Sequence, residues 1–275
     1  MTATGDLTGV RAKIARAHEH ACELKAILAP ILRETEASIV METDGPSKLA
    51  FRAMNVPEID GRWAAIAGDC LHNLRSALDH LAWQLVILDG GTPNMQTQFP
   101  IHEFGADSNG APRDLTIKPG IARSDILQCL QEVQPYTGVQ HGHQAHDSTL
   151  WTLNELSRID KHRLLLTMTH SINGEEPGWW GLPAGVKSPR FSYRIEPIES
   201  GDIVALFDFG DEHAPPEFDP HVALAVSVAE GPPHHWMRLR PIDELLENLV
   251  GSVAHHITWP FIGRLFPNEI PITVL

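Results

Sequence analysis

The residues of this sequence best suited to chemistry are concentrated in segment 68–83, which reads GDCLHNLRSALDHLAW. Its leucines recur at three- and four-residue steps, so a helix would place them on one face. A second, polar set follows the same steps on nearly the opposite face: Asp69, His72, Ser76 and Asp79. A helix face in contact with water normally carries Lys and Glu instead. We therefore expect the polar set either to form a buried hydrogen-bonded network or to line a site.

Carboxylate and imidazole groups on two polar-rich helices predict a metal site. Asp69 and His72 are an i,i+3 pair, and Glu155 and His162 lie seven residues apart, which also places them on one helix face. Helical bundles bind metals through such ligands on neighbouring helices. We predict these four residues as ligands of Fe, Mn or Zn, in a metal-dependent hydrolase or oxygenase. The alternative is a polar network that fixes the two helices together.

The segment Arg75-Ser76-Ala77-Leu78-Asp79-His80 is an Arg-x4-His pattern. It resembles the signature of HEPN-type helical-bundle proteins, many of which are ribonucleases. The resemblance implies that His80 transfers the proton when a ribose 2′-hydroxyl attacks, that Arg75 stabilises charge on the scissile phosphate, and that a homodimer brings two such sites together. The remaining candidate catalytic residues are Asn73, Asp79 and Lys161.

Two other interpretations of this motif stay open. Five residues turn a regular helix by about 140°, so Arg75 and His80 do not share a face of an unbroken helix. Arg75 would then form an i,i+4 ion pair with Asp79, beside a buried and hydrogen-bonded His80. In that case the chain would be a non-catalytic binding or assembly protein whose polar helices hold a fixed network.

A longer pattern extends over residues 68–163. It comprises GDxxHNLRSALDH, TQFPI, QPY and LNxxxxIDKHR, and it resembles a group of bacterial proteins, largely actinobacterial, whose activity is uncharacterised. The resemblance implies that the two polar-rich helices belong together. We therefore expect helices 62–88 and 148–162 to pack side by side, with their polar residues in one partly buried site.

Hydrophobic periodicity predicts where the helices lie. Pro30 should kink or end the first helix, and Gly90-Gly91 should end the second. The polar stripe of the second helix continues into Trp83 and Ile87, which predicts that its C-terminal half is covered on both sides. The expected helices before the β-rich part are 8–38, 62–88, 124–133 and 148–162, with a solvated histidine-containing loop at 134–147.

The fold class predicted from these patterns is α+β, a helical bundle with an antiparallel β-sheet formed mainly by the C-terminal half. We expect a single domain, residues 1–275, with a helical part to about 163, a β-rich part at about 164–230 and a closing helix at about 240–257. The expected strands are 164–169, 191–195, 203–209 and 222–228, besides a hairpin of 38–41 and 49–53.

Composition narrows the classes of partner. The 275 residues carry a net charge of −14, which argues against long duplex DNA and anionic membranes, because both favour Lys/Arg-rich surfaces. RNA or a small molecule is the expected substrate. The three cysteines form no CxxC pair, no run is apolar enough to span a membrane, and the first residues do not read as a signal peptide, so we expect a cytoplasmic protein. The 16 histidines are compatible with every function considered.

Overall fold

The computed structural model confirms the α+β class. Its contacts divide the chain into two compact units, the first made of residues 1–22, 66–164 and 246–275, and the second of residues 23–65 and 165–245. The single domain expected from the sequence stays a prediction. The structure describes residues 5–36, 39–107, 110–115, 117, 120–141, 144–162, 168–172, 187–194, 198–215, 218, 222, 224–228 and 241–273.

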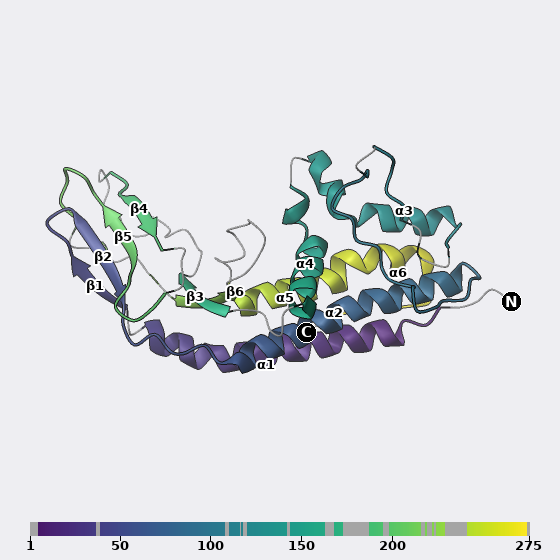
Figure 1. Cartoon of the computed structure of the whole chain (residues 1–275), viewed down its shortest axis with the longest axis horizontal. Helices are drawn as coiled ribbons and strands as arrows, with labels where there is room; N and C mark the ends of the chain where they lie inside the picture. Colours follow the sequence, from purple (N-terminus) through teal and green to yellow (C-terminus); the bar gives the residue numbers. More distant parts are fainter. Residues whose placement is uncertain are drawn as a thin grey trace. The chain divides into compact units, whose positions relative to one another are not determined.

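The first unit is built on parts of two long helices, α1 (Thr8–Glu36) up to residue 22 and α2 (Gly61–Leu88) from residue 66. These parts run side by side (Figure 1). The backbone N–H of Asp6 donates to Oε1 of Gln84 at 2.9 Å, and Nζ of Lys13 donates to Oδ1 of Asn73 at 3.2 Å. Residue numbers rise along α1 while those of their partners fall along α2, so the two helices are antiparallel.

The apolar face predicted for α2 is confirmed. Its leucines from Leu71 to Leu85 are fully buried, as are several small and branched residues on one face of α1. Pro30 does not end α1, which continues to Glu36, close to the end predicted at residue 38. The fully buried residues of α2 are Leu71, Leu74, Leu78, Leu81 and Leu85, and those of α1 in this unit include Ile14, Ala17 and Ala21.

The end of α2 follows the predicted glycines. Gly90 adopts a φ of 85°, its N–H donates to the carbonyl of Ile87, and the N–H of Gly91 donates to the carbonyl of Val86, both at 2.9 Å. This pair of bonds is a Schellman motif, in which a left-handed residue satisfies the last carbonyl groups of a helix. Glycine takes the left-handed conformation without the steric penalty of a Cβ atom. Helix α2 therefore ends where the sequence predicts.

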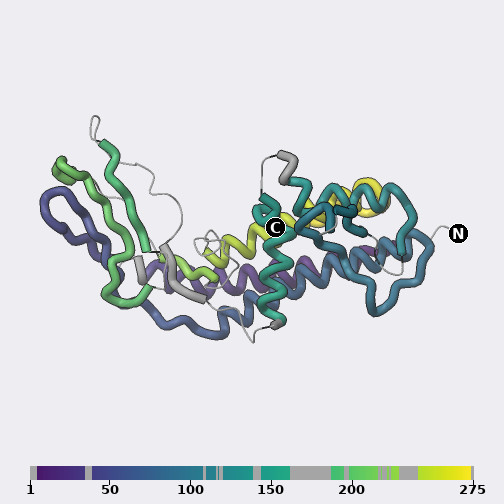
Figure 2. Tube along the Cα trace, turned by 45° about the horizontal axis from the view of Figure 1, so that its top comes forward, coloured from purple at the N-terminus to yellow at the C-terminus, as the bar shows by residue number. Residues whose placement is uncertain are grey.

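The other helices of this unit are shorter. They are α3 (Ser124–Glu132), α4 (Thr149–His162), the end of α5 (Ile242–Ser252) and α6 (Trp259–Leu265), which follows a single π turn at Val253–Ile257. The chain is thus helical again from Trp259, beyond the closing helix predicted at about 240–257. Helix α4 crosses α2 instead of running beside it (Figures 1 and 2). None of the helices among the described residues is long and apolar enough to cross a membrane.

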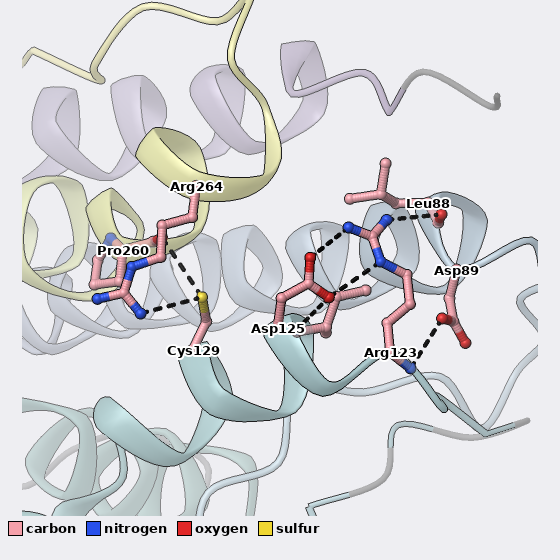
Figure 3. A network of polar contacts seen from close by, with 8 residues as sticks. Leu88, Asp89, Arg123, Asp125, Cys129, Pro260 and Arg264 are labelled. Atoms are coloured by element: carbon pink, nitrogen blue, oxygen red, sulfur yellow. Dashed lines mark hydrogen bonds and ion pairs between the residues drawn. The ribbon is translucent and has the colours of Figure 1, made fainter.

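A polar network fastens α3 to the end of α2 (Figure 3). The backbone N–H groups of Ala122 and Arg123 donate to the carboxylate of Asp89, at 3.0 and 3.2 Å. The guanidinium of Arg123 donates to the carbonyl of Leu88 and pairs with Asp125 in the first turn of α3. These contacts fix the start of α3 against the C-terminus of α2.

A second group in the same view joins α3 to α6 (Figure 3). The guanidinium of Arg264 pairs with Glu132 at 2.8 Å, and its Nη1 lies 3.9 Å from Sγ of Cys129. The thiol of Cys129 donates to the carbonyl of Pro260 at 3.6 Å. Helix α6 is thereby held along α3.

The second unit contains an antiparallel sheet with strand order β1-β2-β5-β4. The predicted N-terminal hairpin supplies β1 and β2, and the other four described strands come from the C-terminal half, as predicted. The pairing of β2 with β5 joins these distant segments, a contact that local sequence patterns do not reveal. The strands are β1 (Ile39–Thr43), β2 (Lys48–Ala53), β4 (Arg190–Tyr193) and β5 (Ile203–Asp208), while β3 (Met168–Ile172) pairs with β6 (Leu224–Val228).

The core of this unit is aromatic. The ring of Phe207 is buried, and its centroid lies 5.6 Å from that of Phe51, 4.8 Å from that of Phe191 and 5.2 Å from that of Phe218. The strand predicted at 203–209 therefore supplies the centre of the sheet. The first part of the strand expected at 164–169 lies outside the described residues, and β3 begins at Met168.

Candidate functional site

The arginine of the Arg-x4-His motif is bound to the chain itself. Nη2 of Arg75 donates to the carbonyl oxygen of Phe99 at 2.8 Å and lies 3.1 Å from Oδ1 of Asp79. The same oxygen of Asp79 accepts the backbone N–H of Phe99 at 2.9 Å. Arg75 and Asp79 thus bind both polar atoms of one peptide residue, and the ion pair predicted as an alternative is confirmed. We call this arrangement the Phe99 clamp.

Arg75 is poorly placed to receive a phosphate. Only 12% of its side chain is exposed, and burial lowers the pKa of the guanidinium, with the negative charge of Asp79 acting in the opposite direction. Its Nη1 is buried and has no hydrogen-bond partner among the described residues. A buried donor without a partner is costly, yet here the ion pair and the carbonyl of Phe99 hold the group in place. A ligand would reach Arg75 only after displacement of the segment around Phe99.

His80 is exposed, which contradicts the expectation that it is buried in the ion-pair arrangement. Its ring lies against the first turn of α1 at Gly9. A Cβ atom placed on Gly9 would be 2.6 Å from Nδ1 of His80 and 3.2 Å from Cε1, closer than such atoms approach. The absence of a side chain at Gly9 therefore makes room for the imidazole. Arg75 and His80 make their described contacts with different segments and do not form one site.

The exposed side of α2 combines polar and aromatic groups. Trp83 is 41% exposed, so the prediction that this half of α2 is covered on both sides is wrong at this position. The reason is that no other described helix lies over this side chain closely enough to bury it. We define the open face of α2 as Asp69, His72, Ser76, His80 and Trp83, which follow one another at helical spacing and are exposed except for the half-buried Ser76.

The crossing of α4 over α2 brings three titratable groups together. Asp160 of α4 lies at Gly68, where a Cβ atom would be 2.7 Å from Oδ1 of the carboxylate. Partial burial raises the pKa of Asp160, the like charge of Asp69 raises it further, and His72 opposes both effects. The two polar-rich helices do meet, as expected, but at a crossing point.

Asn73 and Lys161, both candidate catalytic residues, have different environments. Asn73 is buried, accepts a hydrogen bond from Lys13 of α1 at 3.2 Å and donates to the carbonyl of Asp69 at 2.8 Å. It therefore stabilises the contact between α1 and α2 from a position that substrate does not reach. Lys161 is exposed near the end of α4, and no described contact draws it to the other candidates.

The four predicted metal ligands are not brought together by the contacts that the structure describes. Glu155 is largely buried and forms an ion pair with Arg158 on the next turn of α4. His162 ends α4, and its side chain lies outside the described residues. Asp69 and His72 approach Asp160 instead. Within the described part of the chain, no group of three His, Cys, Asp or Glu side chains is arranged to hold a metal ion.

Some contacts of the site could not be read from the sequence. The polar motif was recognisable from its residue types, whereas Gly9, Lys13 and Phe99 were not identified as its partners. The TQFPI segment, which includes Phe99, gave a signal because it is one of the motifs of the longer pattern. Gly9 gave none, because a glycine near a helix N-terminus is unremarkable without the neighbouring helix in view.

Comparison of the chain with protein-family models, curated proteins and solved structures finds no match. The arrangement of the side chains is therefore the basis for assigning a function.

Proposed function

We propose that this chain is an endoribonuclease that uses His80 for general acid–base catalysis at the open face of α2. The observation that supports it best is the position of His80, exposed on α2 with its ring against Gly9. Histidine changes protonation near neutral pH and is the most frequent proton-transfer residue. One turn along the helix, the exposed ring of Trp83 offers a surface on which a base of single-stranded RNA can stack.

The proposed reaction needs one proton acceptor. Neutral His80 takes the proton of a ribose 2′-hydroxyl, and the resulting oxygen attacks the adjacent phosphorus. The bond from phosphorus to the 5′ oxygen breaks, and that oxygen takes a proton from water. The products are a 2′,3′-cyclic phosphate and a 5′-hydroxyl, and His80 then releases its proton to solvent.

The described contacts change the role proposed for Arg75. Because its guanidinium is committed to Asp79 and Phe99, we assign it as a positioning residue that stabilises α2 beneath His80. The phosphate charge would then need another cation, and a homodimer, in which a second copy faces the open face of α2, is the assembly that this proposal favours. The net charge of −14 favours short single-stranded substrates over long duplexes.

The test is cleavage of 5′-labelled single-stranded RNAs of varied sequence in the presence of EDTA. Wild type should produce 2′,3′-cyclic phosphate ends, and His80→Ala should lower kcat by about 100-fold or more. Trp83→Ala should mainly raise KM. His256→Ala is the matched control, since His256 is exposed outside the open face. Intact RNA after incubation with wild-type protein at high enzyme concentration would overturn the proposal.

A metal-dependent hydrolase is distinguished by the same assay. Cleavage that is lost in EDTA and restored by added Mn²⁺ or Zn²⁺ would favour it, with Asp69 and His72 as the first ligands to replace.

A non-catalytic binding or assembly protein is the second candidate. The observation that favours it is that Arg75, Asp79 and Asn73 all bind other segments of the chain. Under this interpretation RNA remains intact, His80→Ala changes neither stability nor any activity, and Asn73→Ala lowers the free energy of unfolding by about 1–2 kcal/mol.

A further inference from the structure

A cavity of about 400 Å³ lies in the first unit, outside the open face of α2. This volume is within the range of small-molecule sites. Its described lining combines aromatic residues with a glutamate and a glutamine, and small-molecule sites present such a mixture of apolar walls and a few polar groups. The lining residues are Glu103, Phe104, Gly105, Tyr136, Gln144, Ala145 and His146.

Two walls of this cavity are tied together by a buried glutamine. Oε1 of Gln134 accepts the backbone N–H of His102 at 2.9 Å, and its Nε2 donates to the carbonyl of Pro100 at 3.0 Å. The segment that leads to Glu103 is thereby fixed to the segment that leads to Tyr136. A Cβ atom on Gly105 would lie 3.3 Å from the Tyr136 ring, so these walls touch.

The third wall is fixed by its own turn. The backbone N–H of Gln144 donates to Oδ2 of Asp147 at 2.8 Å, and the N–H of Asp147 donates to the carbonyl of Gln144 at 3.0 Å. The ring of His146 packs edge-on against Trp151, with centroids 6.1 Å apart. Each wall of this open pocket is therefore held by contacts of its own within the chain, which reduces the entropy lost when a ligand binds.

The charges of the cavity select the class of ligand. Among the described residues that line this pocket, Glu103 alone carries a permanent charge at neutral pH, so N–H donors are favoured over a phosphate. Burial raises the pKa of Tyr136, which keeps its phenol neutral. Phe104 is 60% exposed, a high value for a phenylalanine, and a planar ligand would cover its ring.

We propose that this cavity binds a planar nitrogen heterocycle with adjacent N–H donors, of the kind present in guanine. The heterocycle stacks on Phe104, and its two neighbouring N–H groups donate to the carboxylate of Glu103. The side-chain amide of Gln144 supplies a further donor and acceptor at the rim. Binding at this site does not depend on RNA cleavage at the open face of α2.

The experiment is isothermal titration calorimetry with guanosine, inosine and adenosine, each up to about 1 mM. Guanosine should bind saturably. Inosine, which lacks the 2-amino group, and adenosine, which lacks both donors, should bind more weakly. No saturable binding of guanosine, or equal affinity for adenosine and guanosine, would overturn the proposal.

Variants locate the binding on these residues. Glu103→Gln and Phe104→Ala should each weaken guanosine binding by about fivefold or more. Glu58→Gln removes an exposed carboxylate elsewhere and should bind as wild type does. Thermal melting checks that Phe104→Ala is folded, as its exposure predicts. If folded Glu103→Gln bound guanosine with unchanged affinity, Glu103 would not recognise the ligand, and the proposed binding site would be refuted.

Discussion

The imidazole of His80 occupies the space that a side chain at Gly9 would fill, with Nδ1 only 2.6 Å from the position of a Cβ atom. Two residues 71 positions apart in sequence are thus matched in size. Glycine has a lower helix propensity than other residues except proline, so its presence in the first turn of α1 needs an explanation. The close approach of His80 to Gly9 supplies a structural reason.

Gly9→Ala should therefore separate function from stability. The added methyl group must displace the His80 ring, which is a side chain free to rotate away. Alanine favours a helix over glycine by up to about 1 kcal/mol, so the free energy of unfolding should stay within about 1 kcal/mol of wild type. If His80 is catalytic, RNA cleavage should fall toward the rate of His80→Ala. Urea unfolding and the labelled-RNA assay measure the two quantities.

Gly251→Ala is the matched control, because Gly251 also lies in a helix and a Cβ atom there meets nothing within 4 Å. It should retain the cleavage rate of wild type. Wild-type cleavage by Gly9→Ala alongside an inactive His80→Ala would show that the orientation of the imidazole does not depend on Gly9.

Removal of Arg75 should destabilise the protein. Arg75→Ala leaves the carboxylate of Asp79 and the carbonyl of Phe99 without their partner in a largely buried place, which should lower the free energy of unfolding by about 2–3 kcal/mol. Arg75→Lys retains the charge but reproduces the contacts less well, and it should be intermediate. Chemical denaturation of the three proteins at one pH is the measurement.

Arg264→Ala provides the comparison for an exposed ion pair. The side chains of Arg264 and Glu132 are 49% and 37% exposed, so the loss of their pair should lower the free energy of unfolding by less than the loss of Arg75 does. Equal stability losses in Arg75→Ala and Arg264→Ala would mean that the Phe99 clamp contributes no more than a surface pair.

The faces of the long helices were predictable because each follows from local periodicity. The leucines from Leu71 to Leu85 are buried as their spacing requires, and Gly90 ends α2 because its left-handed conformation satisfies the last carbonyl groups. The i,i+4 spacing likewise led to the Arg75–Asp79 pair.

The partners of these faces were not predictable, because they depend on contacts between distant segments. The sequence contains no sign that Arg75 and Asp79 meet the backbone of Phe99, or that α4 reaches α2 at Gly68. The exposure of Trp83 was missed for a related reason. An apolar residue in a polar stripe does not require burial, because folded proteins expose a large apolar area.

Asp160 predicts a pH dependence of stability. Its pKa is raised above the ordinary value of 3.8, first by burial and then by Asp69. The folded state therefore binds the proton more tightly, so the stability it contributes is complete below pH 3.8 and is lost as the pH rises through the folded-state pKa. At pH 7, Asp160→Asn should have a larger free energy of unfolding than wild type, and the advantage should shrink below pH 3.8.

Urea titrations of both proteins at several pH values test this sign. Asp211→Asn, which removes an exposed carboxylate outside the cluster, should show no comparable gain. A variant Asp160→Asn that is less stable than wild type at pH 7 would indicate that the negative charge of Asp160 is stabilised in the fold, by His72 or by another cation.

The three cysteines should differ in reactivity because the thiolate is the reactive form. Burial raises the pKa of Cys70 to about 12 and also raises that of Cys129, whereas Cys22 is exposed on α1 with Sγ 3.5 Å from Nε2 of His18. At pH 8 the native protein should react rapidly with a disulfide reagent such as DTNB at Cys22 alone, and Cys22→Ser should abolish this fast phase.

Unfolding in urea should expose all three thiols to the reagent. A fast phase that persists in Cys22→Ser would mean that Cys70 or Cys129 reaches solvent on the time scale of the reaction, and Cys70→Ser would then identify which helix opens.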